Sequence, residues 1–227
     1  MKLLIANRCY SSWSLRAWLL LAAKGIAFEE QLVLLDDPGF KDKVLAAAPG
    51  SGGTAPTLID GDIAVWETLA IAEYLHDRFP QAGIWPADPA ARAHARAISS
   101  EMHAGFSVLR GACPMNLGKR YAACDRGPGV ARDVARITAV WRQARERFGA
   151  GGPFLYGEFS AADAMFAPVV TRLDTYAIAV DAISQAYIEA VLALPAYRDW
   201  LAGALAEPRI AAHEKADEPA VADLRKL

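Results

Sequence analysis

The sequence predicts an α/β domain followed by an all-helical domain, and three observations indicate this. Short apolar runs alternate with helical periodicity over roughly the first eighty residues. A segment that contains several Pro and a Gly comes next, and beyond Asp88 no convincing strand is found. We therefore expect a first domain over residues 1–80, a linker over 81–88 and a helical second domain over 89–227, whose tail is partly irregular.

The first domain begins with a strand and a helix. Residues 2–6 (KLLIA) are apolar and have the length of a buried strand. At 15–22 apolar residues recur at helical spacing, and Gly25 is a stop signal for that helix. Residues 28–35 are interpreted as a second strand, after which the segment 36–38 (DDP) opens a short helix.

The second half of this domain is predicted to contain a hairpin and a helix. Two β-like runs, Thr57–Ile59 and Ile63–Trp66, flank Asp60-Gly61, a dipeptide typical of tight hairpins. Residues 68–79 return to helical spacing and end before a proline. The predicted order is βαβαββα, which places helices on the faces of a small sheet.

The second domain is predicted to be all-helical. Its Ala- and Arg-rich stretches and its shorter periodic segments have helical composition, and they cover residues 90–123, 130–148, 161–177, 184–193 and 196–206. Ser160 and Asp163 form a capping pattern at the start of one of these helices. We expect this pair to stabilise the second domain without touching substrate.

The composition is typical of a globular protein of the cytoplasm. Hydrophobic residues make up 54% of the chain and charged residues 22%, which allows a substantial core. The net charge of -2 gives no reason to expect nucleic acid or a membrane as partner. No signal peptide is recognisable, and no segment approaches the roughly 20 apolar residues that cross a bilayer. Cys9, Cys113 and Cys124 lack metal-ligand spacing, so we expect reduced thiols and no metal.

The segment SSWSLR, residues 11–16, lies where the first predicted helix begins. The unpaired backbone N–H groups and the positive end of the helix dipole favour an anion there. A serine hydroxyl at this point can donate a hydrogen bond to a thiolate, or Ser11 or Ser12 can simply cap the helix. Cys9 begins the pattern Cys-x-x-Ser of monothiol redox enzymes, and the alternative is a buried, inert thiol.

Four motifs, in their order and spacing, resemble those of the cytosolic glutathione transferases. They are SSWSLR, the dipeptide Ala55-Pro56, ETLAI at residues 67–71 and GEFSAAD at residues 157–163. The resemblance covers essentially the whole chain and is to serine-type members, zeta-like (maleylacetoacetate isomerase-like) or tau-like at the N-terminus. It implies a thioredoxin-like first domain, a helical-bundle second domain and glutathione as co-substrate.

The resemblance also implies which residues bind and activate glutathione. In serine-type relatives the active residue often lies five positions before an Arg of the first helix, here Arg16, which indicates Ser11 with Ser12 as the alternative. The bond between Ala55 and Pro56 is expected to be cis, with the Ala55 backbone facing the cysteinyl amide.

The charged ends of glutathione have their own expected partners. The Thr68 hydroxyl and the following helix start are expected to take the γ-glutamyl carboxylate, and Glu67 the ammonium group. The loop before Pro56 is Gly-rich and lacks the Lys or Gln of many relatives, so Lys41 or Lys43 is the candidate for the glycyl carboxylate.

The electrophile site is expected to be walled by aromatic and long side chains, namely Tyr10, Trp13, Met102, Phe106 and Arg110. For Met102 and Phe106, at helical spacing, core packing is the alternative. Because Trp13 replaces the Cys of the zeta-like pattern Ser-Ser-Cys-Ser-x-Arg, conjugation and isomerisation of a small electrophile both remain open. A Cys9-based thiol reductase and a non-catalytic glutathione-binding protein are the other hypotheses.

The resemblance implies a homodimer, and the charge distribution is compatible with one. Residues 92–147 contain 11 Lys/Arg and 4 Asp/Glu, a net +7, whereas residues 1–91 contain 7 Lys/Arg and 11 Asp/Glu, a net -4. The basic segment is either a solvated surface or part of a cleft for anionic substrates. Opposite charges steer unlike domains together, and Trp66, Phe79 and Trp85 are candidates for the apolar contact or for their own subunit's core.

Overall fold

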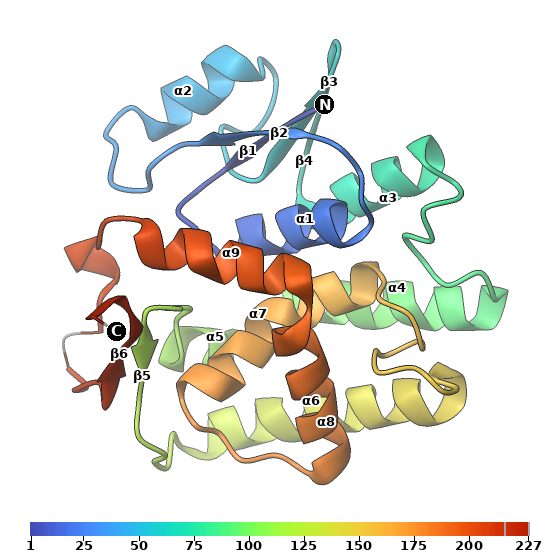
Figure 1. Ribbon diagram of the computed structural model, residues 1–227, viewed down its shortest axis with the longest axis vertical. Coiled ribbons are helices and arrows are strands. Elements are labelled where there is room, and N and C mark those ends of the chain that lie inside the picture. Colours follow the sequence, from blue (N-terminus) through green and yellow to red (C-terminus); the bar gives the residue numbers. More distant parts are fainter. Residues whose placement is uncertain (216, 227) are drawn as a thin grey trace.

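The computed structural model describes residues 1–215 and 217–226, and it contains a small sheet with helices above a bundle of helices (Figure 1). The sheet has the strand order β2-β1-β3-β4, with β1 at Lys2–Ile5, β2 at Glu29–Leu32, β3 at Thr57–Asp60 and β4 at Ile63–Trp66. Strands β1 and β2 are parallel, and the other two neighbouring pairs are antiparallel. The predicted mixed sheet is thereby confirmed.

Three helices cover the faces of this sheet. They are α1 (Ser12–Ala23), α2 (Phe40–Ala47) and α3 (Thr68–Arg78). Helices α1 and α3 lie on the side of the bundle, and α2 lies on the opposite face (Figure 1). Helix α1 buries Leu15 and Leu19 and ends before Gly25, whose φ of +65° is easily adopted by a residue without a Cβ.

The remainder of the chain is mainly helical, which confirms the predicted fold class. The helices are α4 (Pro89–Ala104), α5 (Ser107–Ala112), α6 (Pro128–Phe148), α7 (Ala161–Thr175), α8 (Ala182–Ala193) and α9 (Pro195–Ala206). Helix α7 is buried along almost its whole length and packs against α1, α4 and α8, so it forms the centre of the molecule. Among the described residues, no helix has both the length and the apolar character of a membrane-spanning segment.

Two expectations for this region were wrong. The single helix expected over 90–123 is divided, because Gly105 ends α4 and Phe106 adopts a left-handed φ of 57°. A short strand β5 (Lys119–Arg120) pairs with β6 (Ala222–Asp223), so strands do occur beyond residue 88. Both strands have two residues and lie about 100 positions apart in the chain, so no local sequence pattern predicts them.

The tail after α9 folds back over the start of α1. Lys119 pairs with Asp223 at 2.8 Å, and Arg126 pairs with Glu218 at 2.7 Å. The Tyr10 hydroxyl donates to Glu214 over 2.6 Å, which joins the tail to the loop before α1. The tail thereby packs against the segment that precedes the predicted catalytic serines.

A buried carboxylate organises the start of α7. The side chain of Asp163 accepts hydrogen bonds from the Leu155 backbone N–H (3.0 Å), the Ser160 backbone N–H (2.8 Å) and the Ser160 hydroxyl (3.0 Å). The capping pattern is therefore present, and it also fixes the loop at Leu155. Burial of this side chain raises the pKa of Asp163 to about 6.

Candidate functional site

A pocket of about 540 Å³ lies where the α/β region meets α4. Six residues of its wall are those predicted to bind or activate glutathione: Ser11, Ser12, Ala55, Pro56, Glu67 and Thr68. Tyr10 and Trp13, predicted for the electrophile site, also line it. The structure thus brings together three segments that are up to 57 residues apart in the chain, from Ser11 to Thr68.

Ser11 is the N-cap of α1, and its hydroxyl is held at the mouth of the helix. Its Oγ accepts a hydrogen bond from the Ser14 backbone N–H over 3.2 Å, and the Oγ atoms of Ser11 and Ser14 lie 2.9 Å apart. Ser14 Oγ in turn accepts from the Ala6 N–H over 2.9 Å. Because either hydroxyl can donate in the Ser11–Ser14 pair, Ser14 can donate to Ser11 and leave the Ser11 proton free for an anion in the pocket.

Ser12 is the first residue of α1 and differs from Ser11 in its bonding. It is buried but lines the pocket, and its hydroxyl forms no hydrogen bond with any other described residue. Both serines therefore present a hydroxyl beside the free N–H groups of the helix. The arrangement can stabilise a negative charge at this end of the pocket.

Cys9 lies outside the pocket and is fully buried. Its Sγ is 3.4 Å from Oδ1 of Asn116. Burial raises the pKa of the Cys9 thiol, although the Arg225 guanidinium opposes that shift. The thiol is therefore uncharged at neutral pH and has no open path to a substrate in this conformation.

The segment around Ala55 supplies one side of the pocket. The Ala55–Pro56 peptide bond is cis, in agreement with the expectation for this dipeptide. Thr54, Leu35 and Phe40 extend the same wall. Sequence reasoning missed these three, since they lie in loops or next to them and belong to none of the four motifs.

The start of α3 forms the opposite end. Glu67 is the N-cap, with φ 70°, and its side chain is 57% exposed. The Thr68 hydroxyl is buried and makes no hydrogen bond with another described residue. Since a buried hydroxyl is normally paired, a ligand oxygen accepting from Thr68 and from the first N–H groups of α3 would satisfy this donor.

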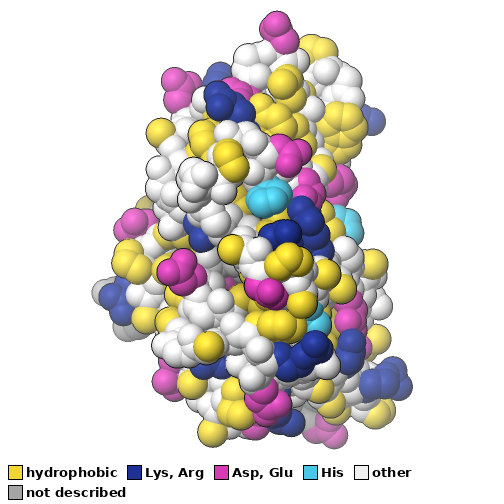
Figure 2. Space-filling model, turned by 90° about the vertical axis from the view of Figure 1, so that its right-hand side faces the viewer, with side chains coloured by type: hydrophobic (Ala, Val, Ile, Leu, Met, Phe, Trp, Pro, Cys, Tyr) yellow, Lys and Arg dark blue, Asp and Glu magenta, His cyan; other side chains and the backbone are white. Residues whose placement is uncertain are grey.

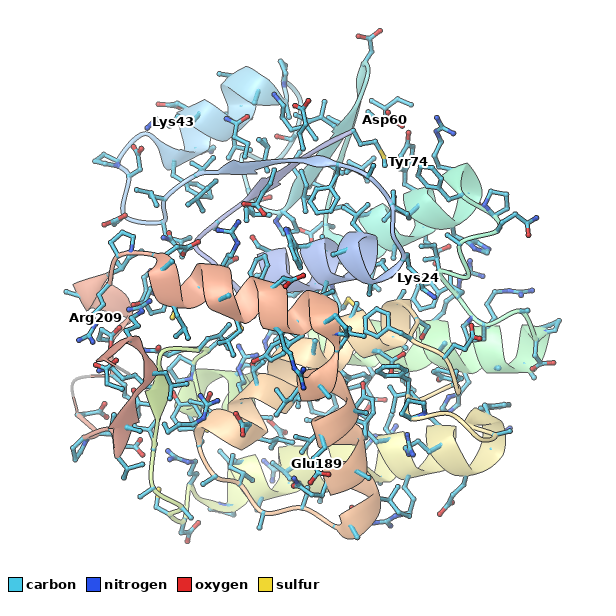
Figure 3. All side chains as sticks on the ribbon, in the orientation of Figure 1. Lys24, Lys43, Asp60, Tyr74, Glu189 and Arg209 are labelled. Carbon is cyan, nitrogen blue, oxygen red and sulfur yellow. The ribbon has the colours of Figure 1, made fainter. Side chains whose placement is uncertain are left out.

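The two candidate lysines do not line the pocket. Lys43 extends from α2 (Figure 3) and forms an ion pair with Asp37, and the Lys43 ammonium holds the pKa of Asp37 below its usual range. The aliphatic part of Lys41 packs against Gly53, where an added Cβ would approach Lys41 Cγ to 2.6 Å. Lys43 is thus engaged with Asp37, and neither lysine belongs to the pocket wall.

Three other candidates also lie away from the pocket wall. Met102 is fully buried and Phe106 is 9% exposed, so both pack in the core. The Arg110 guanidinium lies 4.9 Å from the centre of the Trp13 ring. We assign none of these three side chains a direct contact with an electrophile.

Two guanidinium groups lie close to the Trp13 ring. Besides Arg110, the guanidinium of Arg16 lies 4.2 Å from the Trp13 ring centre. Arg16 is buried and donates to the Met165 carbonyl over 3.0 Å. Burial, together with the charges of Arg172 and Arg110, lowers the pKa of Arg16. The position of Trp13 is thus set by Arg16, which the sequence analysis used only as a spacing marker, and by Arg110, which it assigned to the electrophile site.

His103, near the end of α4, is the principal residue that sequence reasoning missed. It lines the pocket, its ring lies 5.0 Å from the Trp13 ring, and its Nε2 is 3.6 Å from a Glu67 oxygen. His103 is one of two histidines on this Ala-rich helix, and no motif singles it out. Helical spacing had drawn attention to its neighbour Met102 instead.

Comparison with known proteins supports the fold and the family. Residues 10–78 match the model of the glutathione S-transferase N-terminal domain, and residues 127–203 match that of the C-terminal domain. A stringent starvation protein A homolog of Pasteurella multocida is 28% identical over 189 residues, which cover 80% of this chain and 79% of that protein. A probable maleylacetoacetate isomerase of Caenorhabditis elegans is 38% identical over 100 residues, 44% of this chain and 45% of that protein.

Solved structures have the same architecture. A bacterial zeta-class maleyl pyruvate isomerase superimposes with a TM-score of 0.67 at 20% identity, covering 96% of this chain and 100% of that one. A glutathione transferase homolog from Burkholderia, solved with bound glutathione, gives 0.66 at 23% identity, covering 91% and 98%. At these identities the likeness establishes the fold, and the two matched domains establish the family. The chain belongs to the glutathione S-transferase family.

Proposed function

We propose that this protein is a glutathione transferase that binds glutathione in the pocket at the start of α1 and uses it against a small electrophile. The observation that carries the proposal is the arrangement of one pocket. It has serine hydroxyls at a helix start on one side and Glu67 and Thr68 at a second helix start on the other. Relatives named maleylacetoacetate isomerase and zeta-class glutathione S-transferase support conjugation or isomerisation as the reaction.

The chemistry follows from the charge that the helix start favours. A thiol with a pKa near 8.5 that is lowered by about two units becomes mostly thiolate at pH 7, a stabilisation of about 3 kcal/mol. We assign this effect to the N–H groups of α1 and to a hydrogen bond from Ser11, with Ser12 as the alternative donor. The thiolate then forms a carbon–sulfur bond with the electrophile. In conjugation the leaving group departs with its electron pair, and in isomerisation the thiolate itself is later released.

The two ends of glutathione are assigned by charge. Glu67 takes the γ-glutamyl ammonium, while the Thr68 hydroxyl and the N–H groups of α3 take the carboxylate on the same carbon. The Ala55 backbone pairs with the cysteinyl amide. No Lys or Arg lines the pocket within the described part of the chain, so we assign no charged side chain to the glycyl carboxylate.

A second candidate is a non-catalytic glutathione-binding protein, favoured by the hydrogen bond that already engages the Ser11 hydroxyl with Ser14. Retention on glutathione resin, followed by assays with chlorodinitrobenzene and maleylacetoacetate, separates the two. Retention with turnover supports the transferase, and retention without turnover of either compound supports the second candidate. The thiol reductase based on Cys9 is not favoured, because that thiol is buried and uncharged.

Glu67→Ala is expected to weaken glutathione binding and to leave the bound reaction nearly unchanged. The γ-glutamyl ammonium is remote from the sulfur, so the ground state and the transition state lose similar energy. The KM for glutathione should rise about tenfold, the scale of one charge-assisted hydrogen bond, while kcat stays within a few-fold. Steady-state kinetics with varied glutathione measure both. An unchanged KM would contradict the assignment of Glu67.

We also propose that the protein is a homodimer. Ile63 and Trp66 on β4 are 51% and 39% exposed and offer apolar surface on the edge strand of the sheet, whereas Trp85 is 3% exposed and belongs to its own core. Figure 2 shows more Lys and Arg side chains over the lower, helical part of its face than over the upper part. This distribution agrees with the net charges of residues 92–147 and 1–91 and would steer unlike domains together.

The dimer is expected to persist at micromolar concentration. Sedimentation velocity or light scattering should give about twice the 24.4 kDa of one chain. Trp66→Glu is expected to shift the equilibrium towards the monomer, because a charge replaces an apolar contact. Ile183→Glu on α8 serves as the control, because it also replaces an apolar side chain of 39% exposure by a single negative charge. A monomer for the unmodified protein would refute the dimer.

A further inference from the structure

His103 connects the helical part of the molecule with the residue assigned to the γ-glutamyl ammonium. Its side chain reaches from α4 into the pocket and is 31% exposed. Its Nε2 lies 3.6 Å from Oε2 of Glu67, which is the N-cap of α3. The carboxylate that the proposed function reserves for glutathione therefore already has a partner within the chain.

The imidazole ring is held in this orientation. It packs against Trp13 in a tilted arrangement, with 5.0 Å between the ring centres and 58° between the ring planes. Trp13 is itself held by the Arg16 and Arg110 guanidinium groups. Nη1 of Arg110 also donates to the backbone carbonyl of His103 over 3.2 Å. Nδ1 of His103 is buried and has no hydrogen-bond partner among the described residues. Among the described residues, the Glu67 carboxylate, 3.6 Å from Nε2, is the acidic group that this ring approaches.

We propose that His103 is a positioning residue for Glu67 and that its protonation weakens the binding of glutathione. The inference rests on the proposed function, in which Glu67 holds the γ-glutamyl ammonium. An imidazolium ion would form an ion pair with Glu67 and place a positive charge beside the ammonium site. A neutral imidazole removes that charge and leaves the carboxylate to the ligand.

The other charged groups around this end of the pocket keep their charge near neutral pH. Arg16 from α1 and Arg110 from α5, behind Trp13, are guanidinium groups, which remain charged throughout this range. Glu101 on α4 is paired with Arg136 from α6 at 2.7 Å, and this pairing lowers the pKa of Glu101. Tyr10, across the pocket, has its pKa raised to about 12 by burial. A histidine is the side chain type that changes charge between about pH 5 and pH 8.

The test is the pH dependence of ligand affinity, measured with S-methylglutathione, whose sulfur carries no proton. Calorimetric titrations at pH 5.5, 6.5 and 7.5 would compare the unmodified protein with His103→Gln. The unmodified protein should bind about fivefold more weakly at pH 5.5 than at pH 7.5. Coupling between two binding sites typically changes affinity by about 5- to 150-fold, and we expect the lower end because solvent screens the half-exposed Glu67. His103→Gln keeps a hydrogen-bond donor without the charge, and its affinity should be the same at all three values.

His94→Gln is the matched control, since His94 lies on the same helix but bonds to Tyr156 over 2.7 Å, away from the pocket. This variant should retain the pH dependence of the unmodified protein. Equal pH dependence in His103→Gln, or none in the unmodified protein, would overturn the role of His103 and leave the proposed function standing. Absence of binding to glutathione and to S-methylglutathione at pH 7.5 would overturn both.

Discussion

Ser11→Ala is expected to lower kcat/KM for the conjugation of glutathione to chlorodinitrobenzene by about 100-fold, the scale of removing one hydrogen-bond donor from an anion in a preorganised site. The Ser11 oxygen accepts the Ser14 N–H at 3.2 Å and sits at the helix mouth. The accepted hydrogen bond polarises the hydroxyl, which makes it a stronger donor when its proton is turned towards the thiolate. The loss should appear in kcat as well as in kcat/KM. The reason is that Ser11 acts on the thiolate of glutathione that is already bound.

Several variants separate the catalytic effect from the structural one. Ser11→Ala also removes the cap of α1, at a cost of about 1 kcal/mol in unfolding free energy, so urea unfolding should accompany the kinetics. Ser11→Thr keeps both the hydroxyl and the cap and should retain much of the activity. Cys9→Ala should leave kcat nearly unchanged. Full activity in Ser11→Ala with collapse in Ser12→Ala would transfer the role to Ser12, and collapse only in Cys9→Ala would reject the serine mechanism.

The fold could be predicted where local chemistry specifies an element. Helix α1 follows from its apolar spacing, its serine cap and the glycine after it, and the hairpin β3–β4 follows from Asp60-Gly61. The division of the helix expected over 90–123 could not be predicted, because the left-handed residue at the break is Phe106, a type that rarely adopts this conformation. Its conformation is imposed by tertiary packing.

The site could be predicted to the extent that its residues lie in contiguous motifs. Ser11, Ala55 and Thr68 each belong to a short segment whose backbone geometry is local, and the structure brings the three segments to one pocket. Which side chains of α4 reach the pocket could not be predicted in this way. Met102 and His103 are neighbours in sequence but point about 100° apart around the helix, and only the packing of α4 decides that His103 is the one at the pocket.

Asp163→Ala is expected to lower the unfolding free energy by about 3–5 kcal/mol. The reason is that three donors around the side chain, at 2.8 to 3.0 Å, lose their acceptor inside the protein. The substitution also detaches the Leu155 loop from the start of α7, the central helix. Urea unfolding followed by circular dichroism measures the loss. The catalytic parameters of the folded fraction should remain unchanged, since Asp163 does not line the pocket.

Asp181 provides a matched control, because it caps α8 with three similar bonds, to the N–H groups of Ile183 and Ser184 and to the Ser184 hydroxyl, at 2.8 to 3.1 Å. Its side chain is 31% exposed, so water can replace it, and Asp181→Ala should lose only about 1 kcal/mol. Equal losses of unfolding free energy in the two variants would show that burial does not increase the contribution of a capping carboxylate to stability.

The ionisation of Asp163 makes the stability of the protein depend on pH, and the direction of that dependence can be predicted. Burial raises its pKa to about 6 in the folded state, above the value of about 4 in an unfolded chain. The folded protein therefore binds this proton more tightly, and the resulting stabilisation is complete below about pH 4 and lost as the pH rises through 6. Asp163→Asn, which stays neutral, lacks that loss. The stability of the unmodified protein relative to Asp163→Asn should fall between pH 4 and pH 7, and a constant difference would mean that the carboxylate is not destabilised by its burial.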